Sequence, residues 1–392
     1  MRVIELANTV KAFELNLTNR YLALGEAGFS DDAERRALQQ EYAEITLGKN
    51  RLEWISDGAD TPKYFPSLYV SFPAERSPIA DARIAAAQLH QAFLLGNDVV
   101  ARNLFIGKYQ GNFRSSNGKN LVLSLRGLDC KHTINLDTAI AACRNNGTTH
   151  HLTTNAEYAY LALKCKAQGF QPQGNNNYGK DEQGNFGDIV HQYTSGTTKY
   201  FGRVAQGSGP LTWFHDGSPL GVWGLNGNAY EWSPGYRLMD GKIQVLPYNT
   251  AALAETDMSA ASAAWKGVLI DGTLVDPGTE GELKYGAAVA DNTIVLGSAT
   301  WSGSDYFYGL FKDLAYSTQP AILKELGIIP HDAGDYGGDR IYINPAGERC
   351  PSRGGRWNNG SDGGVWYADI IHTRADAGGY IGLRPAFYEP AA

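Results

Sequence analysis

The closing stretch of the chain, residues 353–387, has the sequence RGGRWNNGSDGGVWYADIIHTRADAGGYIGLRPAF and contains two kinds of position. We interpret one kind as fixed by backbone conformation and core packing, and its members are Arg353, Gly354, Gly355, Trp357, Trp366, Gly382, Arg384 and Pro385. The other kind carries side chains that can be exchanged on the same backbone, and its members are Arg356, Asn358, Asp362, Tyr367, Asp369, Ile371, His372, Asp376, Gly378, Gly379 and Tyr380. We therefore expect a rigid scaffold that carries a binding surface.

The composition is that of a folded chain long enough for two or three domains. Of its 392 residues, 43% are hydrophobic and 11% aromatic, which is enough for a sizeable core. The net charge of -7 argues against nucleic acid as a partner, because such binding needs a basic face. No apolar run is long enough to span a bilayer, so we expect no membrane insertion. Residues 1–17 mix acidic and polar side chains into their apolar stretch, which makes them a poor signal peptide.

The four cysteines, Cys130, Cys143, Cys165 and Cys350, are widely spaced and form no CxxC pair. This spacing argues against a zinc knuckle and against a thioredoxin-type motif. Wide spacing in a large chain is more typical of buried thiols than of a disulfide framework. We expect buried thiols.

Residues 1–100 form the first of two predicted regions and are expected to be partly helical. Asp31 and Glu34 have the spacing of a helix start, and a helix is predicted from there to Gly48. An Ala-rich segment, residues 79–95, has apolar residues at helical spacing and is predicted to form another helix. Two roles stay open for the region: an attachment or assembly module, or a helical elaboration packed on the main domain.

Residues 101–392 form the second region, which we expect to be the main domain. LFIGKYQGN, residues 104–112, is predicted to be its opening strand. A first helix is expected after the N-cap Asn135, and a second starts at the capping-box pair Thr154 and Glu157.

An insertion is predicted within this domain at about residues 236–298. It opens with RLMDGKIQVLPY, in which Asp240 and Gly241 have the pattern of a hairpin turn. The end of the chain, from about residue 341, is predicted to be strand and turn.

The order of these segments resembles the formylglycine-generating-enzyme type of C-type lectin fold. GLNGNAYEW, residues 224–232, is similar to the GNxWEW signature of that family. The opening strand, the two helices and the closing RGGRW…IGLRPAF follow in the family's order. The resemblance covers residues 101–392 with the insertion as an interruption, and it implies an α+β fold with irregular backbone around a small antiparallel sheet. Glu231 and Trp232 of the signature are expected to belong to the scaffold.

This family contains enzymes, so an enzymatic member should carry their catalytic residues at matching positions. Formylglycine-generating enzymes use a cysteine pair within the closing segment, whereas no cysteine follows Cys350 here. The related sulfoxide synthases use three histidines at an iron site, and the eight histidines here show no HxxxH or HExxH spacing. We therefore expect no enzymatic activity and no catalytic residues.

Some members of the family also bind calcium beside the GNxWEW signature. If this chain resembles those members, its calcium ligands would be the backbone carbonyls of Gly227 and Ala229 and the carboxylate of Glu231. A further family ligand, Asn or Asp, is Gly224 here. We therefore expect Glu231 to be a hydrogen-bonding carboxylate of the scaffold and expect neither metal nor cofactor.

The closing stretch resembles the variable proteins of diversity-generating retroelements, a branch of the same fold. In that branch a reverse transcriptase copies a template repeat with errors at adenines, chiefly in Asn codons. The products keep a pyrimidine third base and cannot encode Lys, Glu, Gln, Met or Trp. Residues 353–388 contain no Lys, Glu, Gln or Met, and the two tryptophans occupy fixed positions. The exchangeable positions all hold residues that an Asn codon can reach.

The strand predicted in GVWYADII gives the expected binding face. Alternation would place Trp366, Ala368 and Ile370 in the core. Tyr367, Asp369 and Ile371 would then face outward, although an ordinary solvated strand would also show polar residues on that side. Arg356, Trp357, Tyr367 and Tyr380 are of the types that anchor interfaces, and the remaining polar positions would set specificity. We expect Arg353 and Arg384 to pair with buried acceptors.

The sequence thus predicts a non-enzymatic ligand-binding protein whose surface is diversified by a retroelement, for receptor or cell-surface recognition. The ligand would be a protein or another macromolecule, and the setting a phage tail or a bacterial display system. Two alternatives remain: a divergent enzyme of the formylglycine-generating or sulfoxide-synthase type, and an invariant structural or adhesive tail protein. If the first interpretation holds, replacing Tyr367, Asp369 and Tyr380 by alanine should abolish binding and leave thermal stability nearly unchanged.

Overall fold

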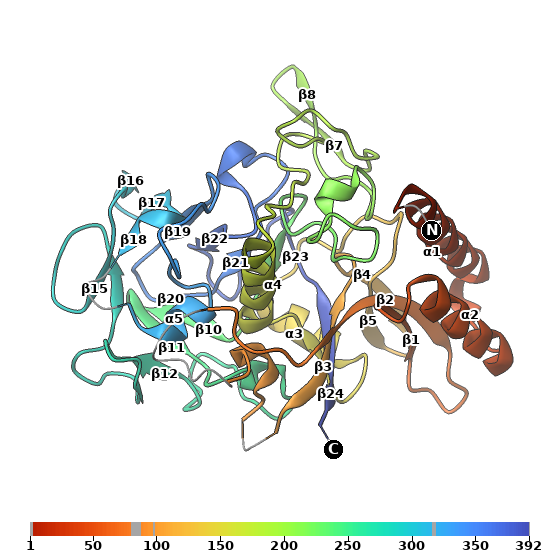
Figure 1. Ribbon diagram of the computed structural model, residues 1–392, viewed down its shortest axis with the longest axis horizontal. Coiled ribbons are helices and arrows are strands. Elements are labelled where there is room, and N and C mark those ends of the chain that lie inside the picture. The colour runs from red at the N-terminus through yellow and green to blue at the C-terminus, as the bar shows by residue number, and fades with distance from the viewer. Residues whose placement is uncertain (1–2, 80–87, 97–98, 316–318, 392) are drawn as a thin grey trace.

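The computed structural model describes residues 3–79, 88–96, 99–315 and 319–391, and its architecture is α+β, as expected (Figure 1). Short strands outnumber helices, and long irregular segments connect them. Within the described ranges, no helix combines the length and the apolar character needed to cross a bilayer. The helices are α1 (Val3–Leu24), α2 (Asp32–Ile45), α3 (Leu136–Arg144), α4 (Asn155–Ala167) and α5 (Ala321–Glu325).

The first sheet joins the beginning of the chain to its end. Its strand order is β1-β2-β3-β24-β6, and each neighbouring pair is antiparallel. The opening strand of the predicted main domain therefore lies directly beside the last strand. The bounds are β1 (Asn50–Ser56), β2 (Tyr64–Pro73), β3 (Ala101–Gly107), β6 (His150–Leu152) and β24 (Pro385–Pro390).

The second sheet contains most of the predicted insertion. Its path is β13-β12-β11-β14-β15-β18, with β10 paired to both β11 and β20. The predicted hairpin is confirmed, because Asp240 and Gly241 turn the chain with φ of 51° and 78°. The bounds are β10 (Tyr236–Met239), β11 (Lys242–Val245), β12 (Lys266–Val268), β13 (Leu274–Val275), β14 (Lys284–Gly286), β15 (Thr293–Leu296), β18 (Leu314–Ala315) and β20 (Glu348–Arg349).

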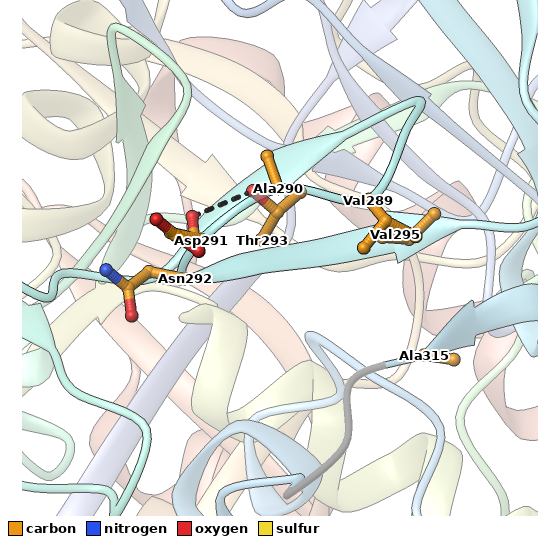
Figure 2. Close-up of a pocket in the computed structure, with 7 residues that line it drawn as sticks. All are labelled: Val289, Ala290, Asp291, Asn292, Thr293, Val295 and Ala315. Atoms are coloured by element: carbon orange, nitrogen blue, oxygen red, sulfur yellow. Dashed lines mark hydrogen bonds between the residues drawn. The ribbon is translucent and has the colours of Figure 1, made fainter.

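A hollow of about 610 Å³ lies on this second sheet beside β15 (Figure 2). It is lined by Val289–Thr293, Val295 and Ala315, with Asp291 as its ionisable residue. Val289 is 89% exposed, so the hollow is an open surface feature. None of the predicted site residues lines it.

The third sheet carries the closing stretch. Its order is β16-β17-β19-β22-β21-β9-β23, so β22 is an internal strand between β19 and β21. β9 holds the YEW of the signature and lies between β21 and β23. The bounds are β9 (Tyr230–Trp232), β16 (Thr300–Ser302), β17 (Tyr306–Leu310), β19 (Arg340–Ile343), β21 (Ser352–Arg353), β22 (Ala368–Ile370) and β23 (Ile381–Gly382).

The two helices of the main domain begin where the sequence predicts. The Asn135 side chain accepts a hydrogen bond from the Thr138 backbone N–H at 2.9 Å and so caps α3. Thr154 and Glu157 form a reciprocal capping box at the start of α4, which satisfies backbone donors that the first turn leaves free. Most residues of α4 are buried, and the helix packs in the main hydrophobic core.

The N-terminal region is built onto the first sheet. β2 pairs with β3 from Tyr69 to Pro73, and α1 and α2 lie at the outer edge beside β1 (Figure 1). α2 starts at the predicted cap, Asp31, whose carboxylate accepts from the Ala33 backbone N–H at 2.8 Å. α1 was not predicted.

The predicted helix over residues 79–95 differs from the structure. Residues 80–87 lie outside the described residues. The rest is a single 3-10 turn, Gln91–Phe93, flanked by short bridges. The turn is held by His90, whose ring accepts from the Ala92 backbone N–H at 3.1 Å and contacts the Glu325 carbonyl at 3.0 Å.

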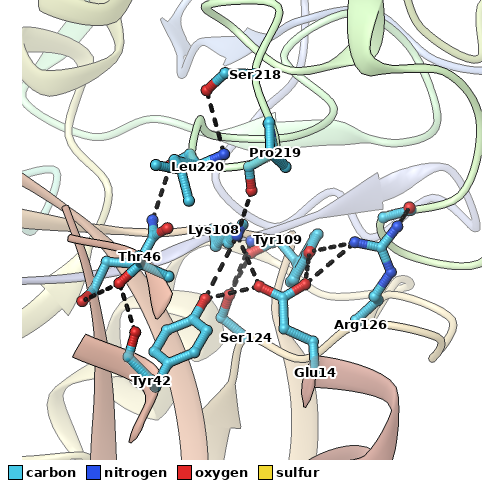
Figure 3. A network of polar contacts seen from close by, with 12 residues as sticks. Glu14, Tyr42, Thr46, Lys108, Tyr109, Ser124, Arg126, Ser218, Pro219 and Leu220 are labelled. Carbon is cyan, nitrogen blue, oxygen red and sulfur yellow. Dashed lines mark hydrogen bonds and ion pairs between the residues drawn. The ribbon is translucent and has the colours of Figure 1, made fainter. Parts of the chain in front are cut away.

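A closed charge network fixes α1 to the opening of the main domain (Figure 3). Glu14 Oε1 lies 2.7 Å from Lys108 Nζ and accepts from the Tyr42 hydroxyl at 2.7 Å. Glu14 Oε2 accepts from the Tyr109 hydroxyl at 2.6 Å and from Arg126 Nη1 at 3.1 Å. Burial alone would raise the pKa of Glu14, but the charges of Lys108 and Arg126 outweigh it and lower that pKa.

Two hairpins complete the described strands. β4 (Asn112–Ser116) pairs with β5 (Lys119–Leu123), and β7 (Gln192–Ser195) pairs with β8 (Thr198–Phe201). The β7–β8 hairpin projects from the molecule at the top of Figure 1. Its flanks expose Phe186 and Phe201, at 56% and 42%.

Candidate ligand-binding surface

A group of aromatic and charged side chains gathers around Tyr230 of β9. The Tyr230 ring stacks on Tyr367 with centroids 5.5 Å apart and meets the edge of Tyr380 at 5.7 Å. The Tyr230 and Tyr367 hydroxyls are 2.9 Å apart and share a hydrogen bond. We call this group the tail cluster, and its members are Tyr230, Tyr342, Arg356, Tyr367, Asp369, His372 and Tyr380.

Strand pairing explains why residues so far apart in the sequence meet. β23 runs parallel to β9, and the Tyr230 backbone N–H donates to the Tyr380 carbonyl at 2.9 Å. β19 runs parallel to β22 in a register that pairs Tyr342 with Asp369. The fixed residues Tyr230 and Tyr342 were not recognised in the sequence as part of the surface, because their neighbours come from these long-range pairings.

The outward orientation expected for Tyr367 and Asp369 is wrong. The strand predicted in GVWYADII is shorter than expected, because β22 is only Ala368–Ile370 and a turn precedes it. The expected division of side chains is nevertheless present, since Trp366, Ala368 and Ile370 enter one core and Tyr367 another. Both faces are covered, however, and Tyr367 and Asp369 are only 1% and 4% exposed. The reason is that β22 is an internal strand whose second face packs against Tyr230 and Tyr342.

Asp369 is a buried carboxylate with weak partners. It accepts from the Ile371 backbone N–H at 3.2 Å and from the Tyr367 hydroxyl at 3.3 Å. His372 Nε2 lies 3.6 Å from Asp369 Oδ2, and its Nδ1 lies 3.5 Å from Asp376 Oδ2. Burial raises the pKa of Asp369, and the nearby His372 offsets this only in part.

Arg356 covers the outer side of the tail cluster. Its guanidinium carbon lies 4.1 Å from the Tyr380 ring centroid and 5.5 Å from that of Tyr230. Cation–π contacts of this kind are favourable and hold the long side chain in place. Arg356 and Tyr380 are half-buried, so the cluster meets the surface at these residues.

The other exchangeable positions lie at the edge of the cluster or beyond it. Asp362 pairs with Arg340 at 2.8 Å, next to Tyr342, and Asp376 caps the Thr373 backbone N–H at 2.8 Å. Ile371 is half-buried, and the Gly379 carbonyl accepts from Arg203 at 3.0 Å. Among the described residues, seven exchangeable positions make no aromatic or cation–π contact with Tyr230: Asn358, Asp362, Asp369, Ile371, Asp376, Gly378 and Gly379.

Arg384 is fully buried and has the buried acceptor that the sequence led us to expect. Its guanidinium binds Glu231 at 2.6 and 2.8 Å and also donates to the carbonyls of Gly107 and Trp223. Arg353 is fully buried over the Tyr158 ring and donates to the Gly327 carbonyl at 3.3 Å.

The remaining scaffold positions are buried as well. Trp232 and Trp366 are 0% exposed and Trp357 is 7% exposed. Gly354 has φ of 86°, and a Cβ there would lie 2.9 Å from the Tyr158 hydroxyl oxygen. Only glycine meets both conditions at that position. Gly355, with φ of 81°, and Gly382 are also buried.

The oxygens named for calcium do not fit that ion. Both carboxylate oxygens of Glu231 already bind Arg384, and Gln110 donates to Glu231 Oε1 at 3.0 Å. The Ala229 carbonyl accepts from the same Gln110 amide at 2.8 Å. A calcium ion placed here would face the guanidinium of Arg384 and would compete with it for Glu231.

The expected buried thiols are confirmed. All four cysteines are free and buried. Burial raises the pKa of Cys350 to about 12 and raises those of Cys130, Cys143 and Cys165 further. Thiols in this state are poor nucleophiles and poor metal ligands, because both roles need the thiolate.

A second aromatic group flanks the closing stretch. His191 and Tyr193, next to or within β7, pack against Trp357 with ring centroids 5.4 and 6.4 Å away. The Tyr178 backbone N–H donates to the Trp357 carbonyl at 2.6 Å. The β7–β8 hairpin was not predicted from the sequence.

The closing stretch thus belongs to an α+β protein in which a buried scaffold carries a polar and aromatic cluster. No family model matches the chain, and no curated protein matches it. Among solved structures it is similar to the Major Tropism Determinant U1 variant, with 10% identity and a TM-score of 0.32, over 87% of this chain and 72% of that one. The P3c variant gives 11% identity and a TM-score of 0.30 over the same shares. Identities and TM-scores this low do not support a transfer of function to this chain. The proposals below rest on the residues of this chain.

Proposed function

We propose that this chain is a non-enzymatic ligand-binding protein with a C-type lectin fold of the formylglycine-generating-enzyme subtype, diversified in its closing stretch by a retroelement. The observation that carries the proposal is the convergence on Tyr230. Four of the predicted exchangeable residues contact this one fixed ring: Arg356, Tyr367, His372 and Tyr380. Four of the eleven positions identified as exchangeable in the sequence thus meet at one place in the fold.

The residue types of the cluster support a binding role. Tyr, Arg and His present large contact areas and polar groups with few rotatable bonds, and interfaces are enriched in Tyr and Arg. The scaffold beneath is rigid, since the Arg384–Glu231 pair and the buried tryptophans anchor the segments on either side. A fixed frame of this kind tolerates exchanges at its surface.

The buried thiols support the non-enzymatic part of the proposal. The cysteine chemistry of formylglycine-generating enzymes requires accessible thiolates in the closing segment. Here Cys350 is 2% exposed, and burial raises its pKa to about 12. The ligand we propose is a protein or another macromolecule on a cell surface, with the chain carried by a phage tail or by a bacterial display system.

The gene itself provides the decisive test of diversification. We expect pyrimidine-ending codons at the eleven exchangeable positions. We also expect an adenine-rich near-repeat of this segment and a reverse transcriptase gene nearby. Purine-ending codons at these positions, or the absence of both neighbouring elements, would leave an undiversified protein and refute the proposal.

Binding is tested separately with a purified panel. Single exchanges at Arg356, His372 and Tyr380 should each change the binding of a natural host-cell surface, while scaffold exchanges should act through stability. Cells that bind the wild type and all three variants equally would contradict a binding role for the cluster.

A further inference from the structure

Arg356 lies at the surface of the tail cluster, and no carboxylate forms an ion pair with it among the described residues. Its backbone N–H donates to Asn359 Oδ1 at 2.7 Å, but its guanidinium makes only the two tyrosine contacts among the described residues. Its Nε is buried and has no hydrogen-bond partner. A buried donor without a partner is costly. A ligand would reach the guanidinium from its solvent-exposed side, since Nη1 and Nη2 are not among the buried unpaired atoms.

Neighbouring arginines show the usual arrangement. Arg340 also lies over a tyrosine ring, that of Tyr308 at 5.4 Å, but it pairs with Asp362 at 2.8 Å. Arg374 pairs with Asp137 at 2.6 Å and also with Glu348. Arg356 differs from these two arginines because no carboxylate pairs with its guanidinium among the described residues.

Burial raises the pKa of Asp369, and Arg356 lies near enough for its charge to oppose that rise, but the two side chains do not form an ion pair among the described residues. The Asp369 carboxylate accepts instead from the Ile371 backbone N–H and the Tyr367 hydroxyl. His372 Nε2 is also buried and makes no hydrogen bond, and it faces Asp369 Oδ2 at 3.6 Å. The charge exposed at the surface of the cluster is therefore that of the half-buried Arg356.

We propose that Arg356, lying on Tyr380 and beside Tyr230, forms a subsite for a carboxylate group of the ligand. This rests on the proposed function and names the ligand chemistry of the same surface. A guanidinium binds a carboxylate through two parallel hydrogen bonds, and the rings hold it in place before the ligand arrives. The carboxylate is either an acidic group of a polypeptide or the acid of a sugar.

The subsite is a property of this particular sequence. Position 356 belongs to the exchangeable set, whereas Tyr230 lies in β9, outside that set. Another residue at position 356 would place a different functional group beside the rings of Tyr230 and Tyr380. The fold thus supplies the site and position 356 supplies its selectivity.

The test uses the full chain, labelled with 15N, and follows the Nε–Hε resonance of Arg356 during titration. The acidic probes are N-acetyl-aspartate methylamide, glucuronic acid and N-acetylneuraminic acid, and the neutral controls are N-acetyl-asparagine methylamide and glucose. We expect a saturable shift with acids and none with neutral probes. Binding of the aspartate derivative alone supports a polypeptide source, and binding of the sugar acids supports a glycan source.

Two variants complete the test. Arg356→Gln should weaken acid binding by about tenfold or more, as expected for loss of a charge-assisted contact, and its thermal midpoint should remain that of the wild type. Arg340→Gln is the matched control, an arginine over a tyrosine that already has its carboxylate, and it should leave acid binding unchanged. Equal shifts with acids and amides, no acid binding, or equal losses in both variants would overturn the subsite.

The outcome is separable from that of the proposed function. If cell binding depends on Tyr380 and His372 while Arg356→Gln changes nothing, the carboxylate subsite fails and the proposed function stands. If acid probes bind at Arg356 while the gene has no template repeat, the subsite stands and diversification fails.

Discussion

The network around Glu14 and the tail cluster both contain buried charged groups. They differ in how many of those groups have hydrogen-bond partners within the chain. In the network around Glu14, each carboxylate oxygen has two donors, and Lys108 donates further to the Pro219 carbonyl at 2.7 Å. In the tail cluster, Asp369 has only weak partners and Arg356 Nε has none. The first cluster is complete within the chain, whereas the second leaves a buried donor unpaired. The two clusters therefore predict different responses to substitution.

The largest expected effect tests the closed network. Glu14→Ala leaves Lys108 and Arg126 buried without their carboxylate, and breaking a buried pair in this way costs about 3–5 kcal/mol. Urea denaturation measures the loss in unfolding free energy. The control Glu34→Gln alters a partly exposed pair with Arg20 and should leave the midpoint unchanged. Equal midpoints for Glu14→Ala and wild type would show that the network does not stabilise the fold.

The second effect tests the buried side of the tail cluster. Tyr367→Ala opens a cavity beside Tyr230 and should cost about 3–5 kcal/mol. Tyr367→Phe removes only the hydroxyl that joins Tyr230 and Asp369 and should cost about 1–2 kcal/mol. The alanine triple variant at 367, 369 and 380 should therefore be strongly destabilised, which corrects the expectation from the sequence. A triple variant as stable as wild type in calorimetry would restore the outward orientation.

A pH effect of intermediate size comes from Asp339, a third buried carboxylate. Burial raises its pKa to about 7, although it accepts from the Trp366 backbone N–H at 2.7 Å. Because the folded state holds this proton more tightly than the unfolded state, the contribution of Asp339 to stability falls as pH rises from about 4 to about 7.

Asp339→Asn keeps an acceptor for Trp366 without the ionisation. The unfolding free energy of the variant minus that of the wild type should therefore increase across this pH window. A difference that is flat with pH, in parallel denaturation series, would contradict the assignment. Such a result would place Asp339 with the fully compensated carboxylates such as Glu14.

The smallest effect separates two adjacent exchangeable glycines. A Cβ at Gly379 would meet only Thr133 Oγ1 at 3.9 Å, so Gly379→Ala should shift the thermal midpoint by no more than about 1–2 °C. A Cβ at Gly378 would approach the Tyr380 ring at 2.6 Å and must displace it. Gly378→Ala should therefore perturb the aromatic resonances of the cluster, and identical spectra for both variants would argue against the Tyr380 placement.

Local signals in the sequence were sufficient for much of the fold. The caps at Asp31, Asn135 and Thr154 and the turn at Asp240-Gly241 were predicted because each depends on residues a few positions apart. The scaffold role of Arg384 was also predicted, although its partner Glu231 is remote.

Long-range pairing explains what the sequence did not show. The buried face of α1 contains Val10, Glu14 and Leu17, and Glu14 suits that face only because Lys108 meets it. Likewise, the alternation in β22 was right, but its cover by Tyr230 and Tyr342 depends on strands that are distant in sequence. The β7–β8 hairpin beside Trp357 was missed for the same reason.

The pairing of β3 with β24 has a consequence for synthesis. β24 lies between β3 and β6, so β3 keeps an unpaired edge until residues 385–390 have left the ribosome. Contacts of such sequence separation form late, and an unpaired edge is prone to aggregation. A mutation that shifts the reading frame or stops translation within the closing stretch removes β24. The truncated chain would keep the exposed edge of β3, and only chains translated in frame to the end of β24 would reach the folded state.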